Sequence, residues 1–254
     1  MGLYIKNVNF AYSPIFGIKN VSADFGNHIT AIIGPNGSGK STLLKCITNQ
    51  LKWTGEIHHD GEFSHLKDKE FISKKLSYLP QTPDIFSSMS VFEAVLLGLI
   101  SELGLRVTQE QERRAEEVLK LLDLEELARQ NINELSGGQL QMVLLAQAII
   151  KKPDILILDE PLNNLDIYRQ FSFLNQISNL VEKHKMTSII VMHDINMAAA
   201  YAESILIMRN GMVYSQGAPE DVITRKMMCE VYSIECEVHR GKNGKVVVEF
   251  IGIV

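Results

Sequence analysis

Short, predominantly apolar runs are the main hydrophobic signal in this chain, and they predict strands buried on both faces of a parallel sheet. Such runs occupy 29–33, 155–158 and 187–192, and a further strand is predicted over 76–79, ended by Pro80. Apolar and polar residues alternate over 3–12 and again over 18–25, with a break at 13–14. This alternation predicts two neighbouring strands with one exposed face, followed by a short strand and turn over 55–61.

The segment from Ser90 to about Ile150 has a helical pattern instead. Capping boxes begin helices at Ser90 and at Thr108, each with Glu or Gln three residues later. The apolar residues of the second helix recur at helical spacing on one face, at Ala115, Val118, Leu119 and Leu122. We therefore expect a helical insert between strands of the α/β core. The apolar run 91–100 belongs mainly to its packing, and any exposed part beside Gln81 would suit partner docking.

Two hairpins are predicted near the end of the chain. The first joins 204–208 to 212–215 through Arg209-Asn210-Gly211. The second covers 236–251 and is centred on Asn243-Gly244, a pair typical of a type I′ turn. Short helices are expected between them.

Composition narrows the class of protein. The chain has 254 residues, a net charge of −5 and 46% hydrophobic residues, which suits one large α/β domain with a subdomain or two small domains. Because the net charge is negative, the composition does not indicate the basic surface that nucleic-acid binding requires. Three scattered cysteines argue against a zinc site or a disulfide framework. The N-terminal segment is no signal peptide, and no run approaches the ~20 apolar residues that span a bilayer.

A glycine-rich loop follows the first buried strand, precedes an apolar segment typical of a helix, and matches the pattern G-x-x-x-x-G-K-[ST]. Glycines let successive backbone N–H groups face a phosphate, and the helix adds its positive N-terminal end. Lys40 can reach the β- and γ-phosphates, and the Ser41 hydroxyl can ligate Mg²⁺. The sequence therefore predicts a nucleoside-triphosphate site. The loop consists of Gly34, Pro35, Asn36, Gly37, Ser38, Gly39, Lys40, Ser41 and Thr42.

Polar side chains end the other predicted core strands. Asp159 and Glu160 follow the run 155–158, His193 follows 187–192, and Gln81 follows 76–79. Ligands of α/β sheets bind at the carboxyl ends of the strands, so two carboxylates there can hold Mg²⁺ and orient water. Gln81 can contact both the metal and an attacking water. Taken singly, Gln81 also fits a solvated turn and His193 a structural role.

A second motif, Leu135-Ser136-Gly137-Gly138-Gln139, precedes a predicted helix. Ser136 and Gln139 form another capping box. A helix that needs only a start would not place two glycines in its first turn, because each costs ~1 kcal/mol relative to Ala. Glycines at a helix N-terminus permit close approach of the backbone to an anion. Tyr12, upstream of the phosphate loop, can stack on adenine, although a packed strand residue is the commoner role for an aromatic there.

Together these residues resemble the nucleotide-binding subunits of ABC transporters along nearly the whole chain. The phosphate (Walker A) loop, Gln81, the signature 135–139, the Walker B strand 155–160, the loop Asn164-Leu165-Asp166 and His193 occur in the family's order. Within the family, the chain resembles the ATPase subunits of importers for iron–siderophore, haem or vitamin B12. The resembling stretches are 90–98, 192–199 and 216–222. The closing hairpin fits that subgroup too.

The resemblance implies a P-loop NTPase (RecA-like) α/β core with an N-terminal antiparallel β subdomain and an inserted α-helical subdomain. We expect one ABC ATPase domain over 1–254. The core with its β subdomain would cover 1–83 and 151–232, and the helical subdomain would cover 84–150. Residues 233–254 would form a C-terminal β-hairpin extension.

The resemblance also assigns roles to residues. Tyr12 would stack on the adenine of ATP, and Lys40 would bind its phosphates. Glu160 would be the general base, and His193 would contact the γ-phosphate. Residues from a second protomer would complete each site in a head-to-tail homodimer. The metal ligands would be Ser41, Gln81 and Asp159, and the second-protomer contacts would come from Ser136, Gly137, Gly138, Gln139 and Asp166.

The expected partners follow from the same resemblance. They are a second ATPase subunit, transmembrane permease subunits contacted partly through Gln81, and a substrate-binding protein reached through the permease, with no nucleic acid. The protein would lie at the cytoplasmic face of the cell membrane. The cargo never touches this subunit, so the sequence carries no signature for it. The chain departs from the family pattern at Leu140, Gln147 and 161–164, which bears on turnover and dimer affinity more than on ATP binding.

Two alternatives belong to other classes. A DNA-organising ATPase of the chromosome-maintenance type shares the motifs but needs a long coiled-coil insertion, for which the spacing leaves no room. An ABC ATPase without a permease, of the iron–sulfur cluster assembly type, fits the length. It fits neither the apolar stretch after Gln81 nor the closing hairpin. We therefore rank the importer subunit first, this second alternative next and the DNA ATPase last.

Overall fold

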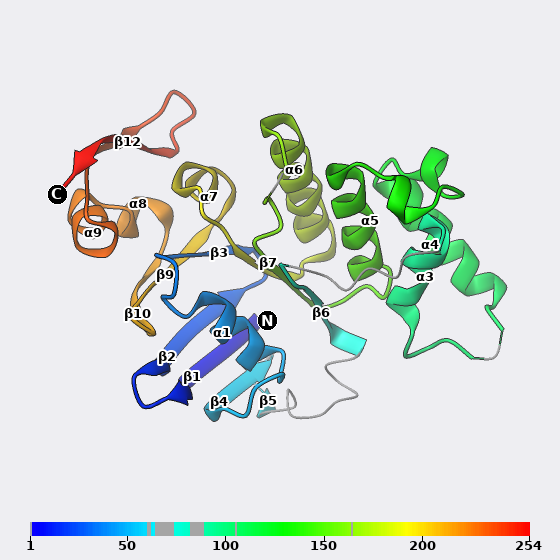
Figure 1. The fold of residues 1–254 in the computed structure, drawn as a ribbon, viewed down its shortest axis with the longest axis horizontal. Helices are drawn as coiled ribbons and strands as arrows, with labels where there is room; N and C mark the ends of the chain where they lie inside the picture. Colours follow the sequence, from blue (N-terminus) through cyan, green and yellow to red (C-terminus); the bar gives the residue numbers. More distant parts are fainter. Residues whose placement is uncertain (1, 60–61, 64–73, 82–88, 105, 164) are drawn as a thin grey trace.

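A mostly parallel six-stranded sheet lies at the centre of the fold (Figure 1), and its strand order is β10-β9-β3-β8-β7-β6. The structure, a computed structural model, describes residues 2–59, 62–63, 74–81, 89–104, 106–163 and 165–254. Every residue of β3, β7 and β8 is buried, as the apolar runs predict. The strands are β3 (Ile29–Ile33), β6 (Leu76–Leu79), β7 (Ile155–Asp159), β8 (Thr187–Val191), β9 (Ser204–Arg209) and the antiparallel edge strand β10 (Met212–Gly217).

The two faces of this sheet are covered by different layers. Alternate strand residues point to opposite sides, so Leu156 and Leu158 belong to one apolar cluster and Ile155 and Ile157 to the other. The first cluster packs against the helical insert, α6 (Ile167–His184) and α7 (Ile195–Tyr201). The second packs against α1 (Lys40–Ile47) and the N-terminal strands. This layering fixes the sheet edge at which the polar loops meet.

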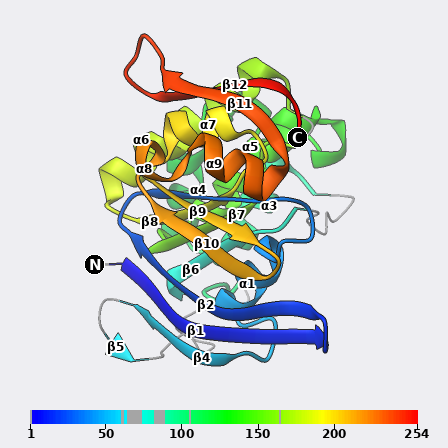
Figure 2. The same ribbon diagram turned by 90° about the vertical axis from the view of Figure 1, so that its left-hand side faces the viewer.

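The N-terminal strands form the expected antiparallel sheet, in the order β2-β1-β4-β5 (Figure 2). Long alternating burial along β1 and β2 leaves one face in the core and the other in solvent. The bounds are β1 (Gly2–Ser13), β2 (Phe16–Gly26), β4 (Thr54–His59) and β5 (Glu62–Phe63).

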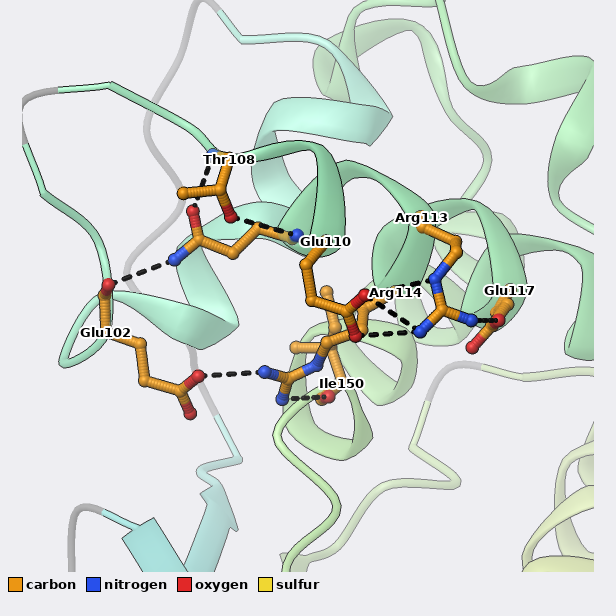
Figure 3. Close-up of polar contacts among 8 residues, drawn as sticks. Glu102, Thr108, Glu110, Arg113, Arg114, Glu117 and Ile150 are labelled. Atoms are coloured by element: carbon orange, nitrogen blue, oxygen red, sulfur yellow. Dashed lines mark hydrogen bonds and ion pairs between the residues drawn. The ribbon is translucent and has the colours of Figure 1, made fainter.

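The helical insert is confirmed between β6 and β7. Its helices are α3 (Val91–Leu96), α4 (Gln109–Leu121) and α5 (Gly137–Ile149), with short 3₁₀ turns at Leu97–Leu99, Glu125–Leu127 and Ile132–Glu134. All three predicted capping boxes, at Ser90, Thr108 and Ser136, form with both reciprocal hydrogen bonds. Arg114 of α4 bridges Glu102 and the carbonyl of Ile150, which ties α4 to the end of α5 (Figure 3). The predicted boundary at 83–84 lies outside the described residues.

The C-terminal hairpin packs on the core through α7. The Asn196 side-chain amide donates to the carbonyl of Val248 at 3.1 Å and accepts from its N–H at 2.7 Å, like one more strand residue. Tyr232, half-buried just before the hairpin, accepts a hydrogen bond from the backbone of Gly34, and its partial burial raises its pKa. The remaining elements are α8 (Pro219–Val222), α9 (Arg225–Met227), a π-helical turn (Met228–Tyr232), β11 (Ile234–Arg240) and β12 (Val246–Ile253).

The predicted type I′ turn at Asn243-Gly244 is wrong. Gly244 has φ +77°, but Asn243 is not left-handed, and five residues, 241–245, connect Arg240 to its partner Val246. The Asn243 side chain accepts the N–H of Lys245 at 3.1 Å, a local bond that favours this longer loop. A two-residue turn with both residues left-handed occurs instead at Asn210 (φ +50°) and Gly211 (φ +76°), inside the first predicted hairpin.

The cysteines are distributed between the core and the surface. Cys46 and Cys236 are buried, Cys229 is exposed, and all three are free thiols. Among the described residues, no helix combines the length and hydropathy that crossing a membrane requires.

Candidate functional site

The carboxyl ends of the core strands bring the predicted catalytic residues to one edge of the sheet. Since β3, β8, β7 and β6 run parallel, the segments that follow them leave the sheet on the same side. They surround a cavity of about 390 Å³. Its lining residues are Phe16, Asn36, Gly37, Gly39, Lys40, Ser41, Thr42, Gln81, Glu160 and His193. Two larger hollows, on α4 and near the ends of α5 and α6, contain neither the phosphate loop nor the residues at the carboxyl ends of the core strands.

The phosphate loop is built to receive an anion. Gly39 adopts φ +102°, a left-handed conformation that favours glycine, and caps α1 without a side-chain hydrogen bond. The first N–H groups of α1 therefore have no side-chain cap and point toward the cavity end of the helix. Lys40 is 5% exposed, and its ammonium donates to the carbonyls of Gly34 at 2.8 Å and Pro35 at 3.0 Å. Burial lowers the pKa of Lys40, while the charges of Glu160 and Asp159 oppose this shift.

Asp159 and Ser41 form a pair of oxygen ligands beside the phosphate loop. The Ser41 hydroxyl donates to Asp159 Oδ1 at 3.1 Å, and the Tyr78 hydroxyl lies 3.4 Å from Oδ2. Burial raises the pKa of the Asp159 carboxyl, and the hydrogen bond from Ser41 opposes the shift. A buried carboxylate and a hydroxyl are hard oxygen donors, so these groups fit Mg²⁺ chemically. The described residues contain no cluster of three or more His, Cys, Asp or Glu side chains that could hold a metal.

Glu160 is held by three side chains from three different segments. Its Oε2 accepts from Gln81 Nε2 at 2.6 Å and from Asn163 Nδ2 at 2.7 Å. Its Oε1 lies 2.8 Å from His193 Nε2. The backbone of Glu160 has φ +53°, an uncommon conformation for a non-glycine residue and one that occurs at functional sites. The structure therefore brings together Gln81, Glu160 and His193, as the strand ends predict.

Asn163 is a site residue that sequence reasoning missed. It entered the sequence argument only as part of the unusual segment 161–164, yet its amide holds the Glu160 carboxylate. A polar amide three residues after a carboxylate in a tight turn is the available signal. Asn164, the first residue of the predicted loop 164–166, lies outside the described residues.

The aromatic wall of the cavity differs from the prediction. Phe16 lines the cavity, and Tyr12, the predicted adenine platform, does not. Tyr12 packs edge-on against Phe10, with ring centroids 4.6 Å apart, and lies 5.6 Å from Phe16 at an interplanar angle of 32°. Tyr12 and Phe16 are each 50% exposed. Tyr12 thus supports the ring that faces the cavity, and Phe16 is the residue that sequence reasoning missed.

The signature residues lie at the start of α5 and do not line this cavity. Ser136 is the N-cap, and its hydroxyl exchanges hydrogen bonds with Gln139. Gly137 and Gly138 form the first turn. Asp166 is the N-cap of α6, where it accepts the N–H of Arg169 at 2.9 Å. Within one protomer, therefore, Ser136 and Asp166 act as helix caps, and none of these residues lines the cavity beside its own phosphate loop.

Residues 18–163 match the family model of the ABC transporter. This chain belongs to that family. An uncharacterised ABC transporter ATP-binding protein of Methanocaldococcus jannaschii is 37% identical to this ABC ATPase over 98% of both chains. The petrobactin import ATP-binding protein YclP of Bacillus subtilis is 32% identical, covering 97% of this chain and 98% of its own. The hemin import ATP-binding protein HmuV of Shewanella denitrificans is 34% identical, with coverages of 91% and 92%.

A solved structure supports the fold of this ABC ATPase. The dimeric bacterial ABC transporter cassette MJ0796 superposes with a TM-score of 0.75 at 30% identity, over 85% of this chain and 98% of its own. The RecA-like core, antiparallel subdomain and helical insert are thereby confirmed as an ATP-hydrolysing cassette fold.

Proposed function

We propose that this ABC ATPase binds Mg·ATP in the 390 Å³ cavity and hydrolyses it to drive a membrane importer of an iron chelate, siderophore or haem, or of vitamin B12. One observation carries the proposal: the phosphate loop, the Asp159–Ser41 pair and the Glu160 cluster converge on a single cavity. The cargo class is supported by the relatives, which are named for petrobactin and hemin import.

In this mechanism the phosphate loop binds the phosphates of ATP, and Glu160 activates the attacking water. Lys40 leaves its carbonyl partners to bind the β- and γ-phosphates, alongside the N–H groups of α1. Ser41 and Asp159 would hold Mg²⁺, with Gln81 as a further ligand, and the ion neutralises phosphate charge when bound. Glu160 accepts a proton from the attacking water, and His193 stabilises the γ-phosphate. Phosphoryl transfer needs this positioning and charge stabilisation more than covalent chemistry.

A second protomer completes each site in the proposed head-to-tail homodimer. Ser136, Gly137, Gly138 and Gln139 contribute from α5, and Asp166 contributes beside them. The cap-like arrangement of Ser136 leaves the open first turn of α5 available to a partner's phosphate. Dimeric cassettes in the family support the association. ATP binding closes the dimer and hydrolysis reopens it, which moves the permease between its two facings.

The permease is proposed to dock on the helical insert, at the cytoplasmic face of the membrane. Most of the apolar run 91–100 is core, as expected, but Ile100 remains 71% exposed. A substrate-binding protein would deliver cargo to the far side of the permease.

Reconstitution tests the proposal. The chain is coexpressed with the permease and binding protein encoded beside it and placed in liposomes with ATP inside. We expect uptake of radiolabelled iron chelate, haem or cobalamin, abolished by Glu160→Gln. An ATPase that hydrolyses Mg·ATP yet neither assembles with that permease nor supports uptake of these cargoes would contradict the importer assignment.

A further inference from the structure

Arg169 reaches from the first turn of α6 to the first turn of α5. Its Nη1 donates to the Ser136 hydroxyl oxygen at 2.9 Å, although 33 positions separate the two residues. Its Nε lies 3.3 Å from Asp166 Oδ2. The Arg169 side chain is 42% exposed, so it contacts both the signature turn and the solvent.

The Ser136 hydroxyl makes more hydrogen bonds than a helix cap requires. A hydroxyl donates one hydrogen and accepts at two positions. Ser136 donates to Gln139 Oε1 at 2.9 Å and accepts from the Gln139 N–H at 3.4 Å and from Arg169. In the described part of the chain, the equivalent boxes at Ser90 and Thr108 form without any guanidinium. The cation at Ser136 therefore serves something other than capping.

The two glycines of the signature turn have different environments. A Cβ at Gly138 would lie 2.4 Å from Arg169 Cδ and 2.5 Å from its Nη1, whereas a Cβ at Gly137 would meet nothing within 4 Å. Gly138 is thus the residue that lets the Arg169 stem lie across α5. Gly137 leaves the same turn open toward the surface. This turn therefore accommodates the Arg169 stem at Gly138 and is open at Gly137.

We propose that Arg169 is a positioning residue of the composite ATP site: it orients the Ser136 hydroxyl and places a cation beside the γ-phosphate of the partner's nucleotide. The inference rests on the proposed head-to-tail dimer. The guanidinium strengthens an anion site formed by the N-terminus of α5, because an arginine fork and a helix N-terminus both favour phosphate. Asp166 holds the guanidinium in place until the partner's phosphate arrives.

ATP-driven dimerisation in the Glu160→Gln background measures this role. Arg169→Ala should weaken dimerisation by about tenfold or more, the usual scale for a lost charged hydrogen bond. Affinity of the monomer for ATP should be unchanged, and the melting temperature should move by less than about 2–4 °C, because the contacts are exposed. Arg169→Lys should restore part of the dimerisation, since it keeps the charge and loses the fork. Arg113→Ala is the matched control, because it removes an exposed arginine with two ion pairs on α4 (Figure 3).

A double-mutant cycle separates positioning from a general defect. Gly138→Ala should impair dimerisation when Arg169 is present and have a clearly smaller effect in the Arg169→Ala background, because the clash is then gone. Equal effects of Gly138→Ala in both backgrounds, or normal dimerisation of Arg169→Ala, would overturn the inference. If Ser136→Asp abolishes dimerisation while Arg169→Ala does not, the composite site stands and only the role of Arg169 falls. If the parent Glu160→Gln chain binds ATP without dimerising, the proposed function fails with it.

Discussion

Replacing Glu160 with Gln removes one negative charge and keeps the shape of the side chain. The amide oxygen can still accept from Gln81 and Asn163, which bond to Oε2 at 2.6 and 2.7 Å. The amide nitrogen then faces His193 Nε2, 2.8 Å from the other oxygen, and a neutral imidazole can accept there by changing tautomer. We therefore expect the variant to fold normally and its cavity to keep its shape.

The rate of ATP hydrolysis should fall strongly in this variant. General-base assistance contributes about 10²–10⁴-fold, or about 3–5 kcal/mol of the barrier. ATP affinity should hold or increase, because a carboxylate that repels the γ-phosphate is gone. Steady-state phosphate release and fluorescent-nucleotide titration measure the two quantities, with Glu249→Gln on exposed β12 as the control. Turnover near the wild-type rate would remove Glu160 from the mechanism, and an equal fall in affinity would make it a binding residue.

Three further variants test the remaining parts of the site. Lys40→Ala should weaken ATP binding about 10- to 100-fold, because a buried ammonium with charged hydrogen bonds is lost; unchanged affinity would contradict the phosphate-cradle interpretation. Asp159→Asn should raise the Mg²⁺ concentration needed for half-maximal hydrolysis, and a metal titration that does not shift would exclude Asp159 as a ligand. Phe16→Ala should weaken ATP binding about 5- to 100-fold, the range of a lost base stack, and leave tripolyphosphate binding unchanged, with exposed Phe250→Ala as its control. Equal losses for ATP and tripolyphosphate would refute the adenine role.

The core strands were predictable because burial on both faces leaves a local signature. The run 155–158 is apolar throughout, the runs 29–33 and 187–191 contain only small hydroxyl residues besides apolar ones, and each of the three lies in a fully buried strand. The strand order was not available in the same way. Placing β3 between β8 and β9 depends on pairing segments more than 150 residues apart. The turn at Asn243 failed for a local reason, since its side chain bonds the backbone two residues on and favours a longer loop.

The residues of the candidate site also divide into those that local sequence predicts and those that depend on distant contacts. Residues at strand ends and in the phosphate loop were predictable, because their type and position suffice to place them at one sheet edge. Phe16, Asn163 and Arg169 were missed, because their roles appear only as contacts: Phe16 lines the cavity, Asn163 holds Glu160, and Arg169 holds Ser136. Ser136 itself has two roles that the sequence cannot separate, since a capping box is fully formed here and a composite site would use the same hydroxyl.

The mass of Ser136→Asp chains in the presence of ATP, measured by light scattering after gel filtration, tests the composite site most directly. Asp caps a helix about as well as Ser, so a purely structural Ser136 would tolerate the change. A carboxylate facing the partner's γ-phosphate would instead place like charges in a dehydrated interface, which disfavours closure by several kcal/mol. We predict a variant, made in the Glu160→Gln background, that folds, binds ATP and remains a monomer while its parent forms dimers. An ATP-bound dimer of normal stability would contradict the composite-site mechanism.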